Sequence, residues 1–146
     1  MISATSSPSP AYGAAAATTA ILLVAMLSAA PALSSEAWTA IDGDTLLHTI
    51  ATKRTVSTEK IRLLGVDAPE LHARCDAERA AAEDARAFVS VALDQATVIA
   101  VEKSTRRDRY GRTLAIVRLD GVSLSAMLLG AGLARPYGGG RRDGWC

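Results

Sequence analysis

Charged residues are missing from the first 35 positions of this 146-residue chain, and aromatic residues are scarce throughout it. All 16 lysines and arginines and all 15 aspartates and glutamates lie beyond Ser35, and the net charge is +1. This near-neutral balance excludes a polycationic tail that holds nucleic acid by counterion release alone. The apolar run from Ile21 to Leu27 is too short to span a bilayer by itself. The length allows one domain.

The uncharged N-terminal stretch has the pattern of a secretory leader. Small and apolar residues fill positions 14–30, and Ala30-Pro31-Ala32 offers small residues where signal peptidase requires them. We therefore predict a signal peptide over residues 1–32 and a mature domain over residues 33–146, exported to the periplasm or secreted. An uncleaved leader that anchors the chain to a membrane is the alternative, because no Lys or Arg precedes the apolar stretch.

Short strands dominate the pattern of the mature chain. Strands are predicted over residues 39–50 with a break at Asp42-Gly43, over 56–66 with a bend at Gly65, over 97–101 and over 113–119. Because these strands outnumber the helices, the pattern favours an α+β fold, a small barrel with flanking helices.

Two helices are expected beside these strands. The longer helix begins at an N-cap, Asp76, and continues to about Leu93, and the shorter one covers residues 122–129. Helical spacing places five residues on the apolar face of the longer helix: Ala77, Ala81, Ala85, Phe88 and Ala92. The two histidines, His48 and His72, are expected on the surface.

Three polar clusters carry the side chains that phosphodiester chemistry needs. They are Asp42-Gly43-Asp44-Thr45, the segment from Arg62 to Glu70, and the basic segment from Arg106 to Arg112. Taken singly, each has a simpler interpretation, as a turn, a helix start and a solvated loop respectively. Together they supply a metal site, two phosphate-binding cations and a base.

The carboxylates divide into two roles. Asp44 and Asp67 offer the hard oxygen ligands that Ca²⁺ prefers, and a backbone carbonyl near Ala68 can join them. Two carboxylates leave most of the coordination shell to water and a substrate phosphate, which is typical of a catalytic site. Glu70 remains as the base that positions or deprotonates a water.

Two arginines complete the predicted site. Arg62 and Arg112 carry planar guanidinium groups, which match phosphate oxygens in a two-point contact. Such cations stabilise the charge that grows on a phosphate during attack.

The order of these segments resembles the staphylococcal nuclease (thermonuclease) family. The matching residues are Ile41-Asp-Gly-Asp-Thr45, Arg62-Leu-Leu-Gly-Val-Asp-Ala-Pro-Glu70 and Asp108-Arg-Tyr-Gly-Arg112, and the similarity covers residues 39–137. The resemblance implies a five-stranded OB-fold β-barrel with flanking helices. It also implies an endonuclease that uses Ca²⁺ to hydrolyse DNA and RNA, without preference for the sugar, and leaves 3′-phosphate ends.

The resemblance also assigns roles to single residues. The metal ligands are Asp44, Asp67 and Ala68, the last standing where the best-known member has Thr. The residues that act on the reacting groups are Arg62, Glu70 and Arg112. Arg109 and Tyr110 contact a neighbouring phosphate of the substrate. A monomer without a stable protein partner is expected.

A non-catalytic OB-fold module that binds nucleic acid is the alternative function. Such modules stack bases on aromatic side chains along a basic groove. The mature chain has only five aromatic residues, and a pure binder has no use for Asp44, Asp67 and Glu70 near its phosphates. These features favour the enzyme.

The two cysteines, Cys75 and Cys146, are expected to form a disulfide. Behind a signal peptide the compartment is oxidising, and an even cysteine count favours a bridge. Two free thiols are the alternative. A bridge would hold the Gly-rich segment that precedes Cys146 against the barrel.

Overall fold

The computed structural model describes residues 34–146, so the predicted signal peptide lies outside the described part. Within that part, no helix is both long and apolar enough to cross a membrane. The elements in chain order are β1 (Ser35–Ala40), β2 (Thr45–Ala51), β3 (Val56–Leu63), β4 (Gly65–Asp67), α1 (Asp76–Gln95), β5 (Ile99–Arg107), β6 (Thr113–Leu119), β7 (Val122–Ser123), α2 (Leu124–Gly130) and β8 (Arg135–Tyr137).

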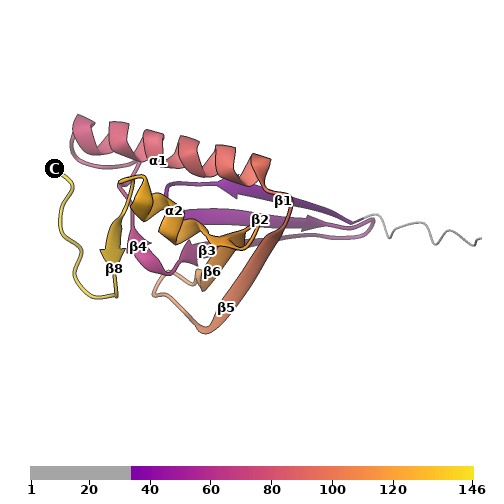
Figure 1. Ribbon diagram of the computed structural model, residues 1–146. Coiled ribbons are helices and arrows are strands. Elements are labelled where there is room, and N and C mark those ends of the chain that lie inside the picture. Colours follow the sequence, from indigo (N-terminus) through magenta and orange to yellow (C-terminus); the bar gives the residue numbers. More distant parts are fainter. Residues whose placement is uncertain (1–33) are drawn as a thin grey trace, which may run out of the picture. The chain divides into compact units, whose positions relative to one another are not determined.

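Five strands form one continuous path in the order β1-β2-β3-β6-β5, and β7 pairs with β6. All neighbours on this path are antiparallel except β3 and β6, which run parallel. A second, two-stranded sheet pairs β4 with β8. The helix α1 lies along the strands β1 and β2, while α2 lies nearer to β4 and β6 (Figure 1). The predicted α+β fold, a five-stranded OB-type sheet with flanking helices, is confirmed.

The core lies between the sheet and the two helices. In β6, buried and half-buried positions alternate, as expected for a strand with one face on the core. The side chains that fill this core completely are aliphatic: Leu46, Ile61, Leu63, Val66, Val89, Val117, Leu124 and Leu128. The loops on which the functional residues lie are therefore supported by a closely packed interior.

The long helix differs from its prediction at its start and in its buried face. Its N-cap is Cys75, so Asp76 is the first helical residue and not the cap. Of the predicted apolar face only Ala85 is fully buried, and the other fully buried residues are Ala82, Val89 and Leu93. The helix turns this way because Val89 and Leu93 bury more apolar area than the alanines that they replace on the core side.

The histidine prediction is half wrong. His72 is exposed, as expected. His48 is buried, because its ring stacks on Trp38 with centroids 4.0 Å apart and its Nε2 lies 2.5 Å from Glu36 Oε1. The paired register of β1 and β2 places Trp38 opposite His48, and this cross-strand contact could not be deduced from one strand alone.

Candidate active site

The first predicted cluster forms a tight loop between β1 and β2. The side chain of Asp42 accepts a hydrogen bond from the backbone N–H of Asp44 at 3.1 Å, which fixes the turn. Gly43 lies so close to the core that a Cβ there would be 2.7 Å from Ala68 Cβ and 2.8 Å from Ala85 Cβ. Only glycine permits this approach, and the approach directs the carboxylate of Asp44 inward.

The second cluster follows the bend between β3 and β4. Gly65 has a φ of 84°, a conformation that favours glycine, and the bend carries the chain from Arg62 to Asp67. The backbone of Leu63 donates to the carbonyl of Asp44 at 2.9 Å, and the N–H of Ala68 donates to Asp44 Oδ2 at 2.9 Å. These two bonds join the loop of Asp44 to the end of β4.

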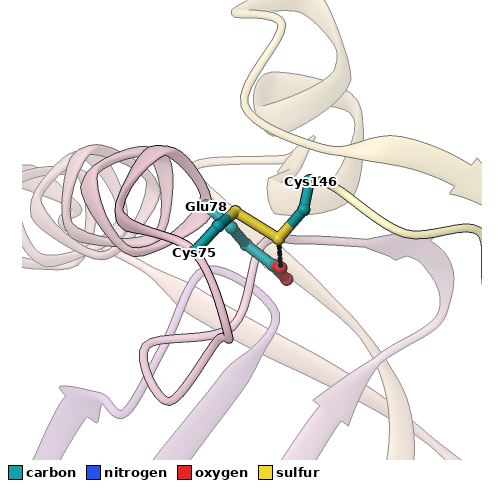
Figure 2. Close-up of side chains that lie close together, drawn as sticks. All are labelled: Cys75, Glu78 and Cys146. Atoms are coloured by element: carbon teal, nitrogen blue, oxygen red, sulfur yellow. Dashed lines mark hydrogen bonds between the residues drawn. A yellow bond between two sulfur atoms is a disulfide. The ribbon is translucent and has the colours of Figure 1, made fainter.

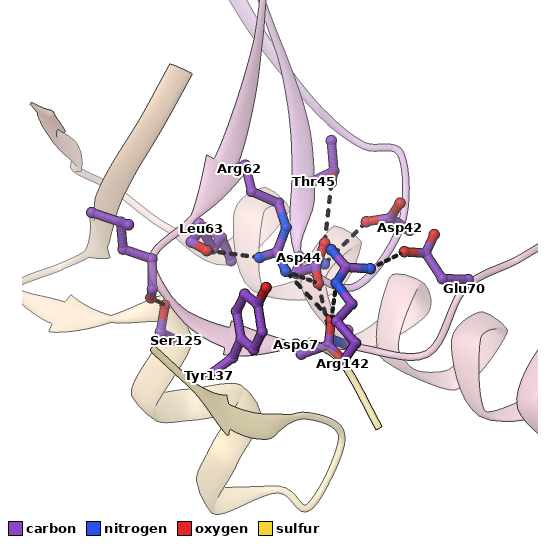
Figure 3. Close-up of polar contacts among 12 residues, drawn as sticks. Asp42, Asp44, Thr45, Arg62, Leu63, Asp67, Glu70, Ser125, Tyr137 and Arg142 are labelled. Atoms are coloured by element: carbon purple, nitrogen blue, oxygen red, sulfur yellow. Dashed lines mark hydrogen bonds and ion pairs between the residues drawn. The ribbon is translucent and has the colours of Figure 1, made fainter. Parts of the chain in front are cut away.

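Asp44, Arg62 and Asp67 meet inside the protein (Figure 3). Arg62 Nη2 lies 2.8 Å from Asp44 Oδ2 and 3.6 Å from Asp67 Oδ1, and all three side chains are almost fully buried. Burial raises the pKa of Asp44 to about 6, although Arg62 and the Ala68 amide oppose the rise. Burial lowers the pKa of Arg62, and the charge of Asp44 works against that change.

Asp44, Arg62 and Asp67, called the acidic cluster here, include two buried atoms that lack a well-directed hydrogen bond. Among the described residues, Asp67 Oδ1 and Arg62 Nη2 are the buried side-chain atoms without a hydrogen bond of good geometry. Both atoms do lie in ion pairs, because Arg62 Nη2 is 2.8 Å from Asp44 Oδ2 and Asp67 Oδ1 is 2.9 Å from Arg142 Nε. Buried charges that are paired without well-directed hydrogen bonds remain costly, and a ligand can offset that cost. The two carboxylates of Asp44 and Asp67 therefore fit the requirements of a divalent cation, whereas the guanidinium of Arg62 fits a phosphate oxygen.

Glu70 lies on the loop that leads from β4 to α1. Its backbone N–H donates to Glu78 Oε1 at 3.3 Å, so the first turn of the helix supports the loop. Its side chain is about half exposed, at 49%, and Oε1 lies 2.5 Å from Arg142 Nη1. Glu70 therefore stands at the solvent side of the buried cluster.

Arg142 and Trp145 also contact the acidic cluster, and neither was predicted. Arg142 Nε lies 2.9 Å from Asp67 Oδ1, and Trp145 Nε1 donates to Asp67 Oδ2 at 3.3 Å. The sequence did contain a signal for this proximity. A bridge from Cys75 to Cys146 necessarily brings the neighbours of Cys146 close to Glu70, which precedes Cys75 by five positions.

Arg112, from the third cluster, reaches the acidic group through a hydroxyl. Its Nη1 donates to Thr45 Oγ1 at 3.0 Å, and this hydroxyl donates to Asp44 Oδ1 at 3.1 Å. Its Nε donates to Asp108 Oδ2 at 2.6 Å. Although burial opposes the effect, bonds from Arg112 and Tyr110 lower the pKa of Asp108 below its usual range. Asp108 therefore holds Arg112 in one orientation.

A cleft of about 870 Å³ opens beside these groups. Arg109 and Tyr110 line it together with the half-buried Tyr137, and the Arg109 guanidinium lies 4.8 Å from the Tyr110 ring centre. Six arginines face this space: Arg62, Arg106, Arg109, Arg112, Arg141 and Arg142. Asp108 is the one acidic residue among its lining residues. A concave surface of this charge attracts a polyanion.

Cys75 and Cys146 are joined in the structure, with their Cα atoms 6.1 Å apart (Figure 2). Glu78 lies beside the sulfur atoms, and the three residues form a group whose ligand atoms are within 4.8 Å of one another. Because the sulfurs bond to each other, this group has no thiolates to offer a metal. The acidic cluster is therefore the better cation site.

Comparison with known proteins identifies the family. Residues 60–143, more than half of the chain, match the model of the staphylococcal nuclease homologues. The chain belongs to the staphylococcal nuclease family. It is 36% identical over 97 residues to "Endonuclease YncB" of Bacillus subtilis (strain 168) and 34% identical over 97 residues to "SPbeta prophage-derived endonuclease YokF" of the same organism. These alignments cover 66% of this chain but only 44% and 31% of the two relatives.

The matched region contains most of the candidate site. It includes Arg62, Asp67, Glu70 and Arg112, whereas Asp44 precedes it. The structure nevertheless brings Asp44 into direct contact with Arg62 and places Ala68 beside it. All the residues that the sequence singled out for phosphodiester chemistry thus lie in the acidic cluster or along the adjoining cleft.

Proposed function

We propose that this protein is a Ca²⁺-dependent endonuclease that hydrolyses phosphodiester bonds of DNA and RNA. One observation carries the proposal: a buried pair of aspartates and an exposed glutamate lie beside a cleft lined with arginines. The similarity to two Bacillus subtilis proteins that are named endonucleases supports it. Because the cleft is lined by arginines that match phosphate groups, which DNA and RNA share, we expect action on both nucleic acids.

Asp44 and Asp67, with the backbone carbonyl of Ala68, would hold the cation. The fit rests on the convergence of two buried carboxylates, because Asp44 and Asp67 both lie against Arg62. Burial also raises the pKa of Asp44, and the positive charge of a bound cation would offset that effect. When bound, Ca²⁺ supplies positive charge that polarises a phosphate oxygen. Two carboxylates leave most of the coordination shell to other oxygens, and this suits Ca²⁺, which accepts flexible oxygen shells, more than Mg²⁺.

The protein side chains account for the remaining steps. Glu70 takes a proton from a water molecule, and the oxygen of that water attacks phosphorus in line with the bond to the 5′-oxygen. The bond from phosphorus to the 5′-oxygen breaks, and the leaving 5′-oxygen takes a proton from solvent water, so one product carries a 3′-phosphate and the other a 5′-hydroxyl. Arg62 and Arg112 bind the phosphate oxygens while their charge grows. Arg109 and Tyr110 hold a neighbouring phosphate.

Export completes the proposal. The leader pattern over residues 1–32 and the joined cysteines both suit an oxidising compartment, the periplasm or the exterior. We infer that the mature domain, residues 33–146, works there as a monomer.

Digestion of closed circular DNA and of RNA by the purified full chain tests this function. With Ca²⁺ we expect both substrates to be cut, and with a calcium chelator we expect no cutting. The fragments should accept a 5′-phosphate from a kinase without prior dephosphorylation, because their 5′ ends are hydroxyls. Binding without cleavage in Ca²⁺ would instead support the non-catalytic module, and undiminished cleavage in chelator would contradict the metal dependence.

A further inference from the structure

The two aspartates of the proposed metal site are closed off from solvent. Asp44 is 2% exposed and Asp67 is 5% exposed, and neither belongs to the wall of the cleft. Arg62 and Arg142 do belong to that wall and contact Asp67 from it. An incoming cation therefore meets these guanidinium groups before it reaches the carboxylates.

Of the two arginines, Arg142 is the one placed to move. The side chain of Arg62 is 4% exposed, on a core strand, and donates to the carbonyl of Leu63 at 2.7 Å. The side chain of Arg142 is 33% exposed and lies in residues 138–146, called the tail segment here, which contains no helix or strand. Arg142 spans from Asp67 to Glu70 and so covers the outer side of the cluster (Figure 3).

Arg142 acts on the same charges as a cation would. Its Nε lies 2.9 Å from Asp67 Oδ1 and its Nη1 lies 2.5 Å from Glu70 Oε1, so it pairs with two carboxylates at once. The carboxylates of Asp44, Asp67 and Glu70 carry three negative charges, and the guanidinium groups of Arg62 and Arg142 carry two positive charges. One net negative charge remains. Without Arg142 the cluster would carry two, a better match for a divalent cation. Asp67 does not need Arg142 for its orientation, because Trp145 also donates to it.

The tail segment is fixed in this position by several contacts. Cys146 is joined to Cys75, and the Arg135 guanidinium lies 3.7 Å from the Trp145 ring centre. Arg135 also donates to the carbonyl of Gly144 at 2.9 Å, and Tyr137 donates to the carbonyl of Gly140 at 2.7 Å. Anchored four residues from Cys146, Arg142 is presented to the carboxylates at a high effective concentration.

We propose that the tail segment is a latch on the metal site, in which Arg142 competes with the divalent cation for Asp67 and the Cys75–Cys146 bond strengthens the competition. The proposal rests on the cation site of the proposed function. Cation binding displaces Arg142 from Asp67, and the oxidised chain consequently binds the cation less tightly than a chain whose tail segment is released. Cation binding and the Arg142–Asp67 contact are then linked, so each weakens the other by the same factor.

Calorimetric titration of Ca²⁺ into the full chain, without nucleic acid, tests the latch. We expect Arg142→Gln to bind Ca²⁺ about fivefold more tightly than wild type, the factor for an ion pair of about 1 kcal/mol. Arg141→Gln is the matched control, because it removes the same charge from the adjacent exposed position, which makes no ion pair among the described residues. It should change the affinity much less.

Removing the disulfide gives a second test of the latch. The double variant C75S/C146S should also bind Ca²⁺ more tightly than wild type, and adding R142Q to it should give little further gain, because both changes act through one contact. In wild type, the Nε–H resonance of Arg142 should shift as Ca²⁺ saturates the site. This measurement needs no variant to fold.

The outcomes separate the latch from the function beneath it. If wild type binds Ca²⁺ but R142Q binds it equally or less tightly, or if R141Q gains as much, the latch is wrong and the metal site stands. An Arg142 resonance that is unchanged at saturation also overturns the latch. If neither wild type nor R142Q binds Ca²⁺, the metal site itself is wrong, and the latch falls with it.

Discussion

The guanidinium of Arg62 lies 2.8 Å from the carboxylate of Asp44, and both side chains are almost completely buried. Removing charges from water costs several kcal/mol per ion, and replacing such a pair by apolar residues is often neutral or stabilising. Stability therefore does not explain this pair. The pair is better explained by its ligands, since Asp44 can bind a cation and Arg62 can bind a phosphate.

The pH dependence of stability tests the burial of Asp44. Because its pKa rises from 3.8 to about 6 on folding, its contribution is fully present below pH 3.8 and is lost as the pH rises through about 6. In chelator, the unfolding free energy of wild type should fall relative to Asp44→Asn by up to about 3 kcal/mol between pH 4 and pH 7. Urea denaturation at each pH measures the difference, and a constant difference contradicts the shift.

The packing of Gly43 gives a steric prediction. Gly43→Ala would place a methyl group 2.7 Å from Ala68 Cβ, so we expect destabilisation of about 1–3 kcal/mol and displacement of the loop that carries Asp44. Gly130→Ala is the control, because a Cβ at Gly130, in α2, meets nothing within 4 Å. That variant should be neutral or slightly stabilising. Thermal unfolding of both decides whether the close approach at Gly43 matters.

The geometry of Arg112 predicts that lysine cannot replace it. Arg112→Lys keeps the charge but loses the fork that contacts both Asp108 and Thr45. We expect kcat to fall by a factor of about 10² to 10³, the cost of losing one stabilising donor at a transition state. Arg118→Lys is the control, because Arg118 on β6 pairs with Glu102 on β5. This variant should keep the wild-type rate. Equal rates for all three proteins would remove Arg112 from its role.

The pairing of the cysteines can be measured directly. Exported protein should be two hydrogens lighter than the dithiol form and should resist alkylation until it is reduced. Cross-linking residues 71 positions apart should raise stability by about 4 kcal/mol in the chain-entropy model. Alkylation of both cysteines without reductant would contradict the bridge and weaken the proposal of export.

Sequence patterns predicted most of the strands from local features, but β5 extends to Arg107, beyond the strand predicted over 97–101, and the pairing of β4 with β8 was not predicted. The break at Asp42-Gly43, the bend at Gly65 and the strand over 113–119 are each specified by residues at that position. Asp44, Arg62 and Asp67 could be grouped because carboxylates and a guanidinium suit a metal and a phosphate, and because their segments resemble those of the staphylococcal nuclease family. The buried face of α1 and the burial of His48 depend on which neighbours pack against them, and such contacts are not encoded locally.

The largest omission concerned the tail segment. Residues 138–146 have no hydrophobic period, so the pattern indicated only a loop. Their position depends on the Cys75–Cys146 bond and on contacts with Arg135 and Tyr137, which bring Arg142 to Asp67 and Glu70. A disulfide that joins distant segments can therefore position a functional side chain, such as Arg142, that hydrophobic periodicity does not predict.

Glu70→Gln tests most directly whether the acidic cluster is a catalytic centre. The substitution keeps the shape of the side chain and removes the base. With Ca²⁺ present, we expect DNA cleavage by this variant to be slower by a factor of about 10² to 10⁴, the usual contribution of a general base. Calorimetry on the same preparation should show Ca²⁺ binding no weaker than in wild type.

The control is Glu83→Gln, on the exposed side of α1, where the carboxylate pairs only with Arg86. It should cleave DNA at the wild-type rate. A Glu70→Gln protein that binds Ca²⁺ and also cleaves at the wild-type rate would contradict the assignment of the base and, with it, the proposed active centre.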